Sequence, residues 1–557
     1  MMIMMEKPKF DVIVIGGGCT GAGIVRDCAM RGLKTLLVER GDVCSETTGT
    51  CAGMISGGVK YLLEPKIVAQ CAKESLILWH IAHNIMFRTP IIWAVTTRKM
   101  KKLAAAMVPA YSSYLGMREG GKIFHISREE ALKLEPRLSD QVAEGVFFEE
   151  LFVDPWRLTL HSIIDAQNYG AEIKTYTKVI SLLKKNDTIY GIRIQNMKTN
   201  EIEDITAKYV INAAGPWVPT ICSMAGIDYK LRLNKGSHII FDRRVSNIGL
   251  VCSAYDGRNA YMFPHENTTI LGVTAIDIFD DPDNIKPDYD DVEYMLSSME
   301  TIMPDLRKHR IIRTFVGVRP MLYKYGVEEG DVTRGFKVID NEKKDGIKGF
   351  ITIAGGKLVT HRLMAEKVTD LICKKLDIDK SCETAIKPLP GATGNVDVEV
   401  LSEKFKLDYH VIKRMVIRHG PKTEKILSKL TNEPVYKSTI CTCESATNVE
   451  MRYCIQNEYA KHLDDLRRRL RIGSGPCQGT GCIFKAITIL NDELNYPMDE
   501  SNVDLLDFLN ERWKGIWPAL RGEQLSEAEL SQGIYGCVGN YIDPYFIPKH
   551  KYRSYKV

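Results

Sequence analysis

Three glycines near the start of the chain have the spacing of a phosphate-binding turn. Gly16, Gly18 and Gly21 stand in GxGxxG order within the stretch FDVIVIGGGCTGAG. In such a turn one glycine permits the tight bend, one lets a pyrophosphate approach the backbone, and one lets the next helix pack on the strand. The N-terminus of that helix points the positive end of its dipole at the phosphates. The spacing therefore predicts a dinucleotide site, with a purely structural loop as the alternative.

The segments around these glycines supply the rest of a dinucleotide-binding unit. Residues 12–15 are all apolar, which is typical of a parallel strand buried on both faces. A helix that ends at Gly32 and a second strand over residues 35–38 follow. Glu39 then stands where a carboxylate binds a ribose diol, and Arg40, the next residue, is also expected to contact the cofactor. The complete unit indicates a dinucleotide far more strongly than the glycines alone.

Further small and polar residues are expected to line the same crevice. Thr47, Thr48 and Gly49 lie in a hydroxyl-rich segment that suits a backbone close to a ligand, with a surface loop as the alternative. Two more buried strands end in small residues, which brings their ends to the cofactor edge of a parallel sheet. The expected contacts there are Ala214, Gly215, Gly355, Gly356, Lys357 and Leu358.

Four cysteines have the spacing of a metal or cluster site. Cys441 and Cys443 form one close pair, and Cys477 and Cys482 form another among several glycines. Two such pairs can place four thiolates around zinc or an iron–sulfur cluster. The glycines favour the cluster, because backbone amides must reach its sulfurs. Four unrelated buried thiols remain the alternative, and Cys454, on the apolar face of a predicted helix, is not expected to be a ligand.

Composition places the chain among ordinary globular proteins. Its 557 residues exceed one hydrophobic core, and 26% are charged and 45% hydrophobic. A net charge of +5 gives no argument for nucleic acid. No apolar run reaches the length of about 18 residues that spans a bilayer. The opening MMIMMEKPKF lacks the apolar core and cleavage site of a signal peptide, so a cytoplasmic location is expected.

The pattern of elements predicts an α/β fold with a β-rich cap. Short alternating segments at 231–241, 260–264, 269–274 and 313–320 read as an antiparallel sheet over the cofactor. Helices are expected over 69–85 and 152–169, and Ser127 with Glu130 reads as a capping box. His238, Arg319 and Arg334 lie in or near this β region, although a lone histidine or arginine there is usually structural.

The expected domains follow from these segments and from a turn-rich linker after residue 385. The cofactor-binding pieces are placed at about 8–90, 150–225 and 345–375, and the cap at about 91–149 and 226–344. A helical linker domain over 386–435, a cysteine domain over 436–495 and a helical tail over 496–557 follow. The basic run RKMKK beside an apolar stretch suggests peripheral contact with anionic lipid, with a solvated helix face as the alternative.

With these motifs together, the chain resembles the FAD-dependent glycerol-3-phosphate dehydrogenases, of the A-subunit type of the anaerobic enzyme, over nearly its whole length. The resemblance implies a Rossmann-like FAD domain of the glutathione-reductase and D-amino-acid-oxidase type, an antiparallel substrate domain and a small helical domain with a 2Fe–2S cluster. The motifs that carry it are GGGCTGAG, KGSH at 235–238, GVRP at 317–320, GFITIAGGKLVTHRLMAE at 349–366, DLRRRLRIGSGPCQGTGC at 465–482 and FLNERWKG at 508–515.

The resemblance also implies an activity. In the family, FAD accepts a hydride from C2 of sn-glycerol 3-phosphate, dihydroxyacetone phosphate is formed, and electrons leave through further subunits toward quinone. His238 would then be the general base, Arg319 and Arg334 would clamp the phosphate or the C2 oxygen, and Lys357 would stabilise reduced flavin. The cluster, held by the four cysteines, would pass on single electrons.

The chain departs from the family pattern at the expected substrate site. Ser56 and Lys60 in SGGVKY replace the histidine and arginine of HSGARY, whereas Tyr61 is retained, and His361 replaces a tyrosine. Lysine keeps the charge but loses the bidentate fork that suits a phosphate. Lys60, Tyr61 and His361 are still expected to bind substrate. Two alternatives stay open: oxidation of another 2-hydroxy acid or an amine, and a non-catalytic electron-transfer component of a larger complex.

Overall fold

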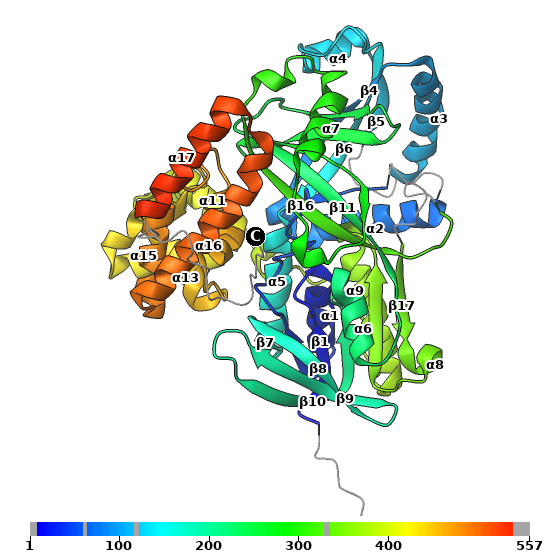
Figure 1. The fold of residues 1–557 in the computed structure, drawn as a ribbon, viewed down its shortest axis with the longest axis vertical. Coiled ribbons are helices and arrows are strands. Elements are labelled where there is room, and N and C mark those ends of the chain that lie inside the picture. Colours follow the sequence, from blue (N-terminus) through cyan, green and yellow to red (C-terminus); the bar gives the residue numbers. More distant parts are fainter. Residues whose placement is uncertain (1–7, 59–63, 116–121, 328–334, 539–557) are drawn as a thin grey trace, which may run out of the picture.

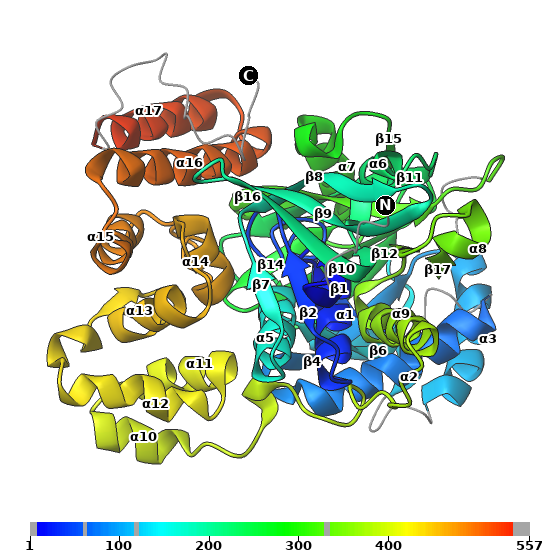
Figure 2. The ribbon, with the colours of Figure 1, turned by 90° about the horizontal axis from the view of Figure 1, so that it is seen from below.

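The computed structural model describes residues 8–58, 64–115, 122–327 and 335–538. Two sheets form the body, and helices from the last third of the chain gather on one side of it (Figures 1 and 2). The predicted substrate residues Lys60, Tyr61 and Arg334 lie outside the described residues. No described helix is both long enough and apolar enough to cross a membrane.

The first sheet is the predicted parallel one, assembled from distant parts of the chain. Its order is β17 (Phe336–Asp340), β18 (Phe350–Gly355), β10 (Ile202–Asn212), β1 (Phe10–Ile15), β2 (Thr35–Val38) and β7 (Glu172–Lys174). All neighbours are parallel except β17 and β18. The hairpin of β8 (Thr177–Lys185) and β9 (Thr188–Asn196) extends from β10.

Both faces of this sheet are covered, which explains its continuous apolar strands. Val12 and Val14 face α1 (Cys19–Met30) and α9 (His361–Lys375). Ile13 and Ile15 face the opposite core, shared with the β8–β9 hairpin and α6 (Val218–Met224). α5 (Pro155–Asn168) lies beside α1.

The second sheet is the cap. Its path is β15 (Ile276–Ile278), β11 (Leu231–Phe241), β14 (Thr268–Gly272), β13 (Asn259–His265), β12 (Gly249–Ser253), β4 (Met86–Val95), β6 (Glu144–Val153) and β3 (Met54–Ile55). β16 (Ile311–Leu322) pairs with β11, and β5 (Ile123–Ser127) with β6. The pairing is antiparallel as predicted, except that β4 and β12 run parallel.

Four helices of the described residues accompany the cap, and two of the predicted helices have different bounds. They are α2 (Pro65–Ile81), α3 (Arg98–Leu115), α4 (Arg128–Leu134) and α7 (Tyr289–Glu300). The capping box of Ser127 and Glu130 is present at the start of α4. The helix expected over 69–85 is α2, which both begins and ends four residues earlier, at Pro65 and Ile81. The helix expected over 152–169 begins only at Pro155, because Asp154 caps it and the preceding residues complete β6.

The last third of the chain is helical around one core. α10 (Val398–Phe405), α11 (Tyr409–His419) and α12 (Lys422–Ser428) precede a short ladder of β19 (Thr439–Cys441) and β20 (Ala446–Thr447). α13 (Asn448–Asn457), α14 (Leu463–Leu470), α15 (Ile483–Leu494), α16 (Met498–Ile516) and α17 (Gly522–Val538) follow. One hydrophobic core runs from Leu401 to Leu509, so the expected linker, cysteine domain and start of the tail pack together.

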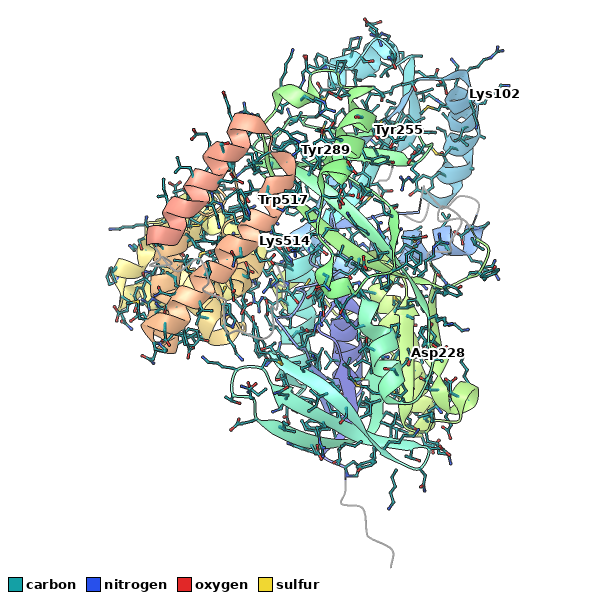
Figure 3. All side chains as sticks on the ribbon, in the orientation of Figure 1. Lys102, Asp228, Tyr255, Tyr289, Lys514 and Trp517 are labelled. Atoms are coloured by element: carbon teal, nitrogen blue, oxygen red, sulfur yellow. The ribbon has the colours of Figure 1, made fainter. Side chains whose placement is uncertain are left out.

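The helical region meets the body through buried polar contacts. Arg157 on α5 is 1% exposed, and its Nη1 lies 3.0 Å from Glu458 Oε1. α16 approaches the cap, where Thr314 Oγ1 donates to Gly515 O at 2.8 Å. Figure 3 shows Lys514 and Trp517 at this junction, near Tyr289 of the cap.

Candidate active site

The predicted cofactor residues meet at one edge of the parallel sheet. Gly16 follows β1, Glu39 follows β2, Ala214 follows β10, and Gly356 follows β18. These strands are parallel neighbours, so their carboxyl ends open onto the same crevice. The added Cβ of a residue at Gly215 would meet nothing within 4 Å, so the crevice is open there.

The phosphate-binding turn has the close contacts that require glycine. A Cβ at Gly21 would lie 1.9 Å from Gly16 O, and one at Gly16, whose φ is +113°, would lie 2.6 Å from Ala213 O. Gly18 caps α1 and brings no side chain, and the first turn of the helix has no acidic residue. The turn therefore leaves the N-terminus of α1 suited to a pyrophosphate.

Glu39 lies beside this turn. Its Oε2 accepts from Gly17 N at 2.6 Å, and its Oε1 accepts from Gly41 N at 2.8 Å. Burial raises the pKa of Glu39, although these two backbone donors oppose the shift. The next residue, Arg40, forms a bidentate pair with Asp283 and stacks on Trp217 at 4.0 Å. The predicted ribose acid is thus at the crevice, whereas Arg40 links the crevice to the cap.

The segment with Thr47, Thr48 and Gly49 connects the phosphate turn to the cap. Thr48 Oγ1 accepts from Cys19 N at 3.2 Å, at the start of α1. Thr47 Oγ1 donates to Val318 O on β16 at 2.6 Å. Gly49 is confined, because a Cβ there would lie 1.9 Å from Cys44 O. A ligand in the crevice would therefore meet both the turn and the cap through one short segment.

The turn after β18 carries the predicted lysine. Gly355 and Gly356 have φ of +78° and +89°, values that favour glycine, and Leu358 opens a short 3-10 helix. Lys357 Nζ lies 3.2 Å from Cys71 Sγ on α2. No sequence motif identified Cys71 as a partner, because 286 residues separate it from Lys357.

His238 is buried in the cap sheet. Its Nε2 lies 3.0 Å from the Tyr261 hydroxyl, its ring stacks on Phe315 at 4.7 Å, and its Nδ1 has no hydrogen-bond partner among the described residues. Burial, followed by the positive charge of Arg319, lowers the pKa of His238 to about 3. The imidazole is therefore neutral near pH 7. Tyr261 was not identified from the sequence.

Arg319 shares a sheet face with His238. β11 and β16 pair Asn234 with Arg319 and His238 with Phe315, so these alternate positions project to one side. Arg319 Nη1 donates to Asn234 Oδ1 at 2.6 Å, and both terminal nitrogens lie 3.2 Å from Thr274 O. A Cβ at Gly317, on the same face, would lie 2.6 Å from Thr50 Oγ1. The face with His238 and Arg319 thus adjoins the Thr47–Thr50 segment.

His361 and Ser56, which lie at the family's substrate positions, have polar partners outside the face with His238 and Arg319. His361 packs against α1 at Gly23, and its Nδ1 lies 2.7 Å from Leu358 O. Burial lowers the pKa of His361 to about 4. Ser56 Oγ lies 3.5 Å from Glu150 Oε1, and Gly57 N donates to Glu150 Oε2 at 3.0 Å. Glu150 is 1% exposed and was not identified from the sequence.

The four predicted cysteine ligands form two close pairs. Cys443 Sγ lies 3.6 Å from Cys477 Sγ. Cys441 and Cys482 form the second pair, in which their hydrogen bond raises the pKa of Cys441 and lowers that of Cys482. A Cβ at Gly475 would lie 2.5 Å from Cys443 Cβ, so this glycine lets the two loops meet.

Three other side chains that could bind a metal lie closer together than the four cysteines do. Among the described residues, the only three or more candidate metal ligands whose atoms all lie within 4.8 Å of one another are His419, Cys454 and Glu458. Arg157 already occupies this set: its Nη1 pairs with Glu458 and its Nη2 lies 3.8 Å from Cys454 Sγ. Burial would raise the pKa of Glu458, but the charges of Arg157 and His419 hold it well below its usual value. The set is therefore an ion-pair network.

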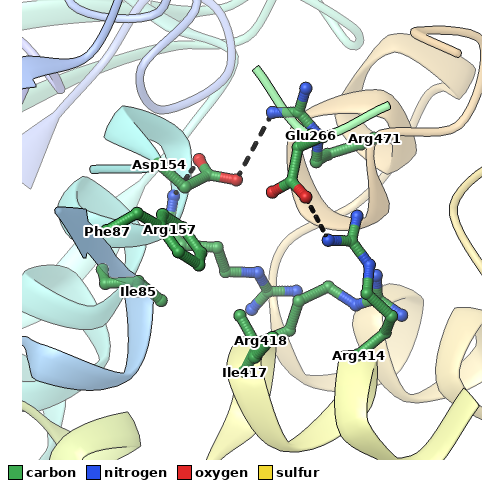
Figure 4. A pocket seen from close by; sticks show the side chains of 9 residues that line it. All are labelled: Ile85, Phe87, Asp154, Arg157, Glu266, Arg414, Ile417, Arg418 and Arg471. Atoms are coloured by element: carbon green, nitrogen blue, oxygen red, sulfur yellow. Dashed lines mark hydrogen bonds and ion pairs between the residues drawn. The ribbon is translucent and has the colours of Figure 1, made fainter. Parts of the chain in front are cut away.

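A small pocket lies beside this network, between body and helical region (Figure 4). Arg414 pairs with Glu266 at 2.5 Å, and Arg471 approaches Asp154 at 3.7 Å across it. Each of the arginines that line the pocket has a carboxylate partner: Arg157, Arg414, Arg418 and Arg471. The pocket therefore has the character of a polar interface, with its charges already matched.

Comparison with known proteins agrees with this architecture. Residues 11–371 match the family of FAD-dependent oxidoreductases, and residues 382–501 match the C-terminal domain of alpha-glycerophosphate oxidase. The A subunit of the anaerobic glycerol-3-phosphate dehydrogenase of Escherichia coli is 34% identical over 95% of this chain and 97% of its own length. The A1 subunit of the same enzyme from Haloferax volcanii is 31% identical over 96% and 91%.

A solved structure has the same fold over nearly the whole chain. The glycerol-3-phosphate dehydrogenase of Bacillus halodurans, complexed with FAD, superposes with a TM-score of 0.74 at 23% identity, covering 93% of this chain and 97% of that one. The matches extend over nearly the whole chain. They are in accord with the parallel sheet, its glycine turn and the β cap that the structure shows. The chain belongs to the FAD-dependent oxidoreductases, in the glycerol-3-phosphate dehydrogenase family.

Proposed function

We propose that the protein is an FAD-dependent dehydrogenase that oxidises sn-glycerol 3-phosphate to dihydroxyacetone phosphate. The observation that supports the proposal is that the cofactor crevice and one face of the cap sheet lie next to each other. The glycine crevice opens at the carboxyl ends of the parallel strands, and the cap face with His238 and Arg319 adjoins its Thr47–Thr50 segment. Relatives that match over almost their full length carry the name of this activity.

The cofactor residues fit FAD. The turn of Gly16, Gly18 and Gly21 would hold the pyrophosphate and Glu39 the ribose, while the backbone at Gly215 and Gly356 would approach the rest of the molecule. When bound, FAD supplies the hydride acceptor. Lys357 would place a positive charge where reduced flavin is negative, and it already makes a polar contact with Cys71.

The cap residues would bind the negative charge of the substrate and accept the proton of its hydroxyl group. Arg319 is held by Asn234 and Thr274 and would bind an anionic oxygen of the substrate. His238 is neutral because its pKa is about 3, so its Nδ1, which has no partner among the described residues, can accept a proton without first losing one. Lys60, Tyr61, Arg334 and His361 remain predicted substrate contacts.

Turnover of glycerol 3-phosphate with an artificial electron acceptor tests the activity. We expect glycerol 3-phosphate to bleach the flavin absorbance and to be oxidised. Bleaching by another 2-hydroxy acid or an amine, but not by glycerol 3-phosphate, would contradict the substrate. A flavin that no such compound reduces, but that reduced partners do, would indicate a protein that only transfers electrons.

We further propose that Cys441, Cys443, Cys477 and Cys482 bind a 2Fe–2S cluster. The arrangement of the sulfurs in two pairs favours a site with two iron atoms over a site with a single metal ion. In a tetrahedral site with metal–sulfur bonds of about 2.3 Å, all four sulfurs lie within about 4 Å of one another. No three of these described sulfurs converge within 4.8 Å, although Cys443 and Cys477 lie 3.6 Å apart. Each pair would therefore hold one iron.

Metal and sulfide analysis of anaerobically purified protein separates the cluster from zinc. We expect iron and labile sulfide in equal amounts, and an EPR signal after one-electron reduction. One zinc without sulfide would contradict the cluster while leaving the dehydrogenase proposal intact.

We also propose protein partners and contact with a membrane surface. Relatives that are named as one subunit of an enzyme favour electron-accepting partner proteins. α3 presents exposed basic residues, among them Lys102 at its outer side (Figure 3), next to Leu103, which is 58% exposed. This combination suits peripheral contact of a cytoplasmic protein with anionic lipid. We propose that residues 1–385 form the catalytic part, followed by a helical linker over 386–435, a cysteine domain over 436–495 and a tail over 496–557.

A further inference from the structure

A helix of the C-terminal region contacts the edge of the cofactor crevice. Asp42 follows the ribose acid Glu39 by three residues and is 2% exposed. Arg468 Nε lies 2.5 Å from Asp42 Oδ2, and Arg469 donates to both carboxylate oxygens at 2.7 and 2.8 Å. Both arginines belong to α14. More than 420 residues of chain therefore separate the partners of this buried contact.

The segment that holds Asp42 shapes the crevice. Gly41 N donates to Glu39 Oε1 at 2.8 Å, and Cys44 N donates to Gly17 O at 3.0 Å. Residues 39–44 thus run from the ribose acid to the phosphate turn. Asp42 lies in the chain between the donors of these two contacts, Gly41 and Cys44.

Tyr176 provides a second link between α14 and this segment. Tyr176 N donates to Gly41 O at 2.9 Å, and the Tyr176 hydroxyl donates to Asp465 Oδ1 at 2.6 Å. Arg468 Nη2 donates to the same Asp465 oxygen at 2.7 Å. Asp42, Tyr176 and α14 therefore form one closed network of buried, charge-assisted hydrogen bonds.

We propose that α14 is part of the FAD site: Arg468 and Arg469 are positioning residues that hold residues 39–44 in the shape that binds FAD. The proposal rests on the FAD binding proposed above. FAD affinity then depends on a helix of the C-terminal region that acts through residues 39–44. Because coupling is reciprocal, bound FAD must also stabilise α14.

The first test measures FAD affinity of the full chain freed of flavin, by titration of FAD fluorescence. Arg469→Met and Asp42→Asn should each raise the Kd for FAD by about tenfold or more. Asp42→Asn takes the carboxylate charge away from both arginines, and Arg469→Met leaves the buried Asp42 with Arg468 alone. The matched control is Arg452→Met. Arg452 pairs with Asp492 and Glu493 inside the C-terminal region, so its loss should leave the Kd unchanged.

The second test uses the wild-type protein, so it can be carried out even if a variant folds poorly. Backbone amides of α14 should exchange hydrogen more slowly when FAD is added to the flavin-free wild-type protein, whereas those of α10 should not change. A folded Arg469→Met protein with wild-type affinity, or α14 exchange indifferent to FAD, would overturn the proposal. A wild-type protein that binds no FAD would instead overturn the proposed function as well.

Discussion

The imidazole of His238 and the hydroxyl of Tyr261 lie 3.0 Å apart across an intervening strand. β14 runs between their strands, and its Gly272 pairs with both residues. A Cβ at Gly272 would lie 2.5 Å from His238 Cδ2 and 3.1 Å from Tyr261 Cε2. The histidine and the tyrosine can therefore meet only because the residue between them has no side chain.

Gly272→Ala should disrupt this pair without touching the FAD crevice. The added methyl group would push the imidazole aside, and misplacing a proton acceptor by about 1 Å can cost on the order of a hundredfold in rate. We expect kcat to fall by about tenfold to a hundredfold at normal FAD content. Steady-state kinetics and the flavin absorbance of the purified variant check this; an unchanged kcat would contradict a role of the His238–Tyr261 pair.

The low pKa of His238 predicts how stability changes with pH. Its pKa is about 3 in the folded protein and about 6.5 in the unfolded chain, so between these values the unfolded state binds more protons. The stability that neutral His238 contributes is complete above pH 6.5 and is lost as the pH falls toward 3. His161 and His265, with similar pKa values, act in the same direction.

His238→Asn removes one of these groups. Urea unfolding between pH 4.5 and 7 should show a shallower decline of the unfolding free energy for the variant than for the wild type. The difference in slope should be at most about 1.4 kcal/mol per pH unit. Equal slopes would show that His238 is not buried as a neutral group.

Arg319→Ala should weaken catalysis through the substrate charge. Loss of a charge-assisted hydrogen bond costs about 1.5–3 kcal/mol, which corresponds to a loss of roughly tenfold to a hundredfold in kcat/KM. Arg319→Lys should recover part of this loss, because the charge returns without the bidentate geometry. The control is Arg193→Ala, since Arg193 on β9 pairs with exposed Asp204 on the neighbouring strand β10. Full activity of Arg319→Ala would rule out substrate binding by this residue.

The cysteine pairs predict which substitutions release iron. Cys443→Ala and Cys477→Ala should each lose the cluster, because each removes one thiolate from the same pair. Cys454→Ala should keep it, since Cys454 faces Arg157 in the ion-pair network. Iron content and the EPR signal of the three proteins check this. Iron loss in Cys454→Ala alone would reverse the ligand assignment.

Local sequence determined the elements of the cofactor crevice. The glycine turn, its flanking strand and helix, and Glu39 lie within about 30 residues, and each follows from backbone conformation or burial that the residue type itself favours. The alternating segments of the cap and the capping box at Ser127 were predicted for the same reason, and the structure confirms them. The start of α5 was misplaced, because apolar residues 152 and 153 suit a strand as well as a helix and only pairing with β4 decided between them.

Only the tertiary structure decided which side chains meet. Three polar contacts connect residues that are hundreds of positions apart in the chain: Asp42 with Arg469, Lys357 with Cys71, and Arg157 with Glu458. No periodicity or spacing in the chain encodes such pairs, because a buried charge needs a partner but does not specify where in the sequence that partner lies. The sequence by itself determined the crevice, the cap strands and the family; the packing of the helical region against the body decided how the crevice is held.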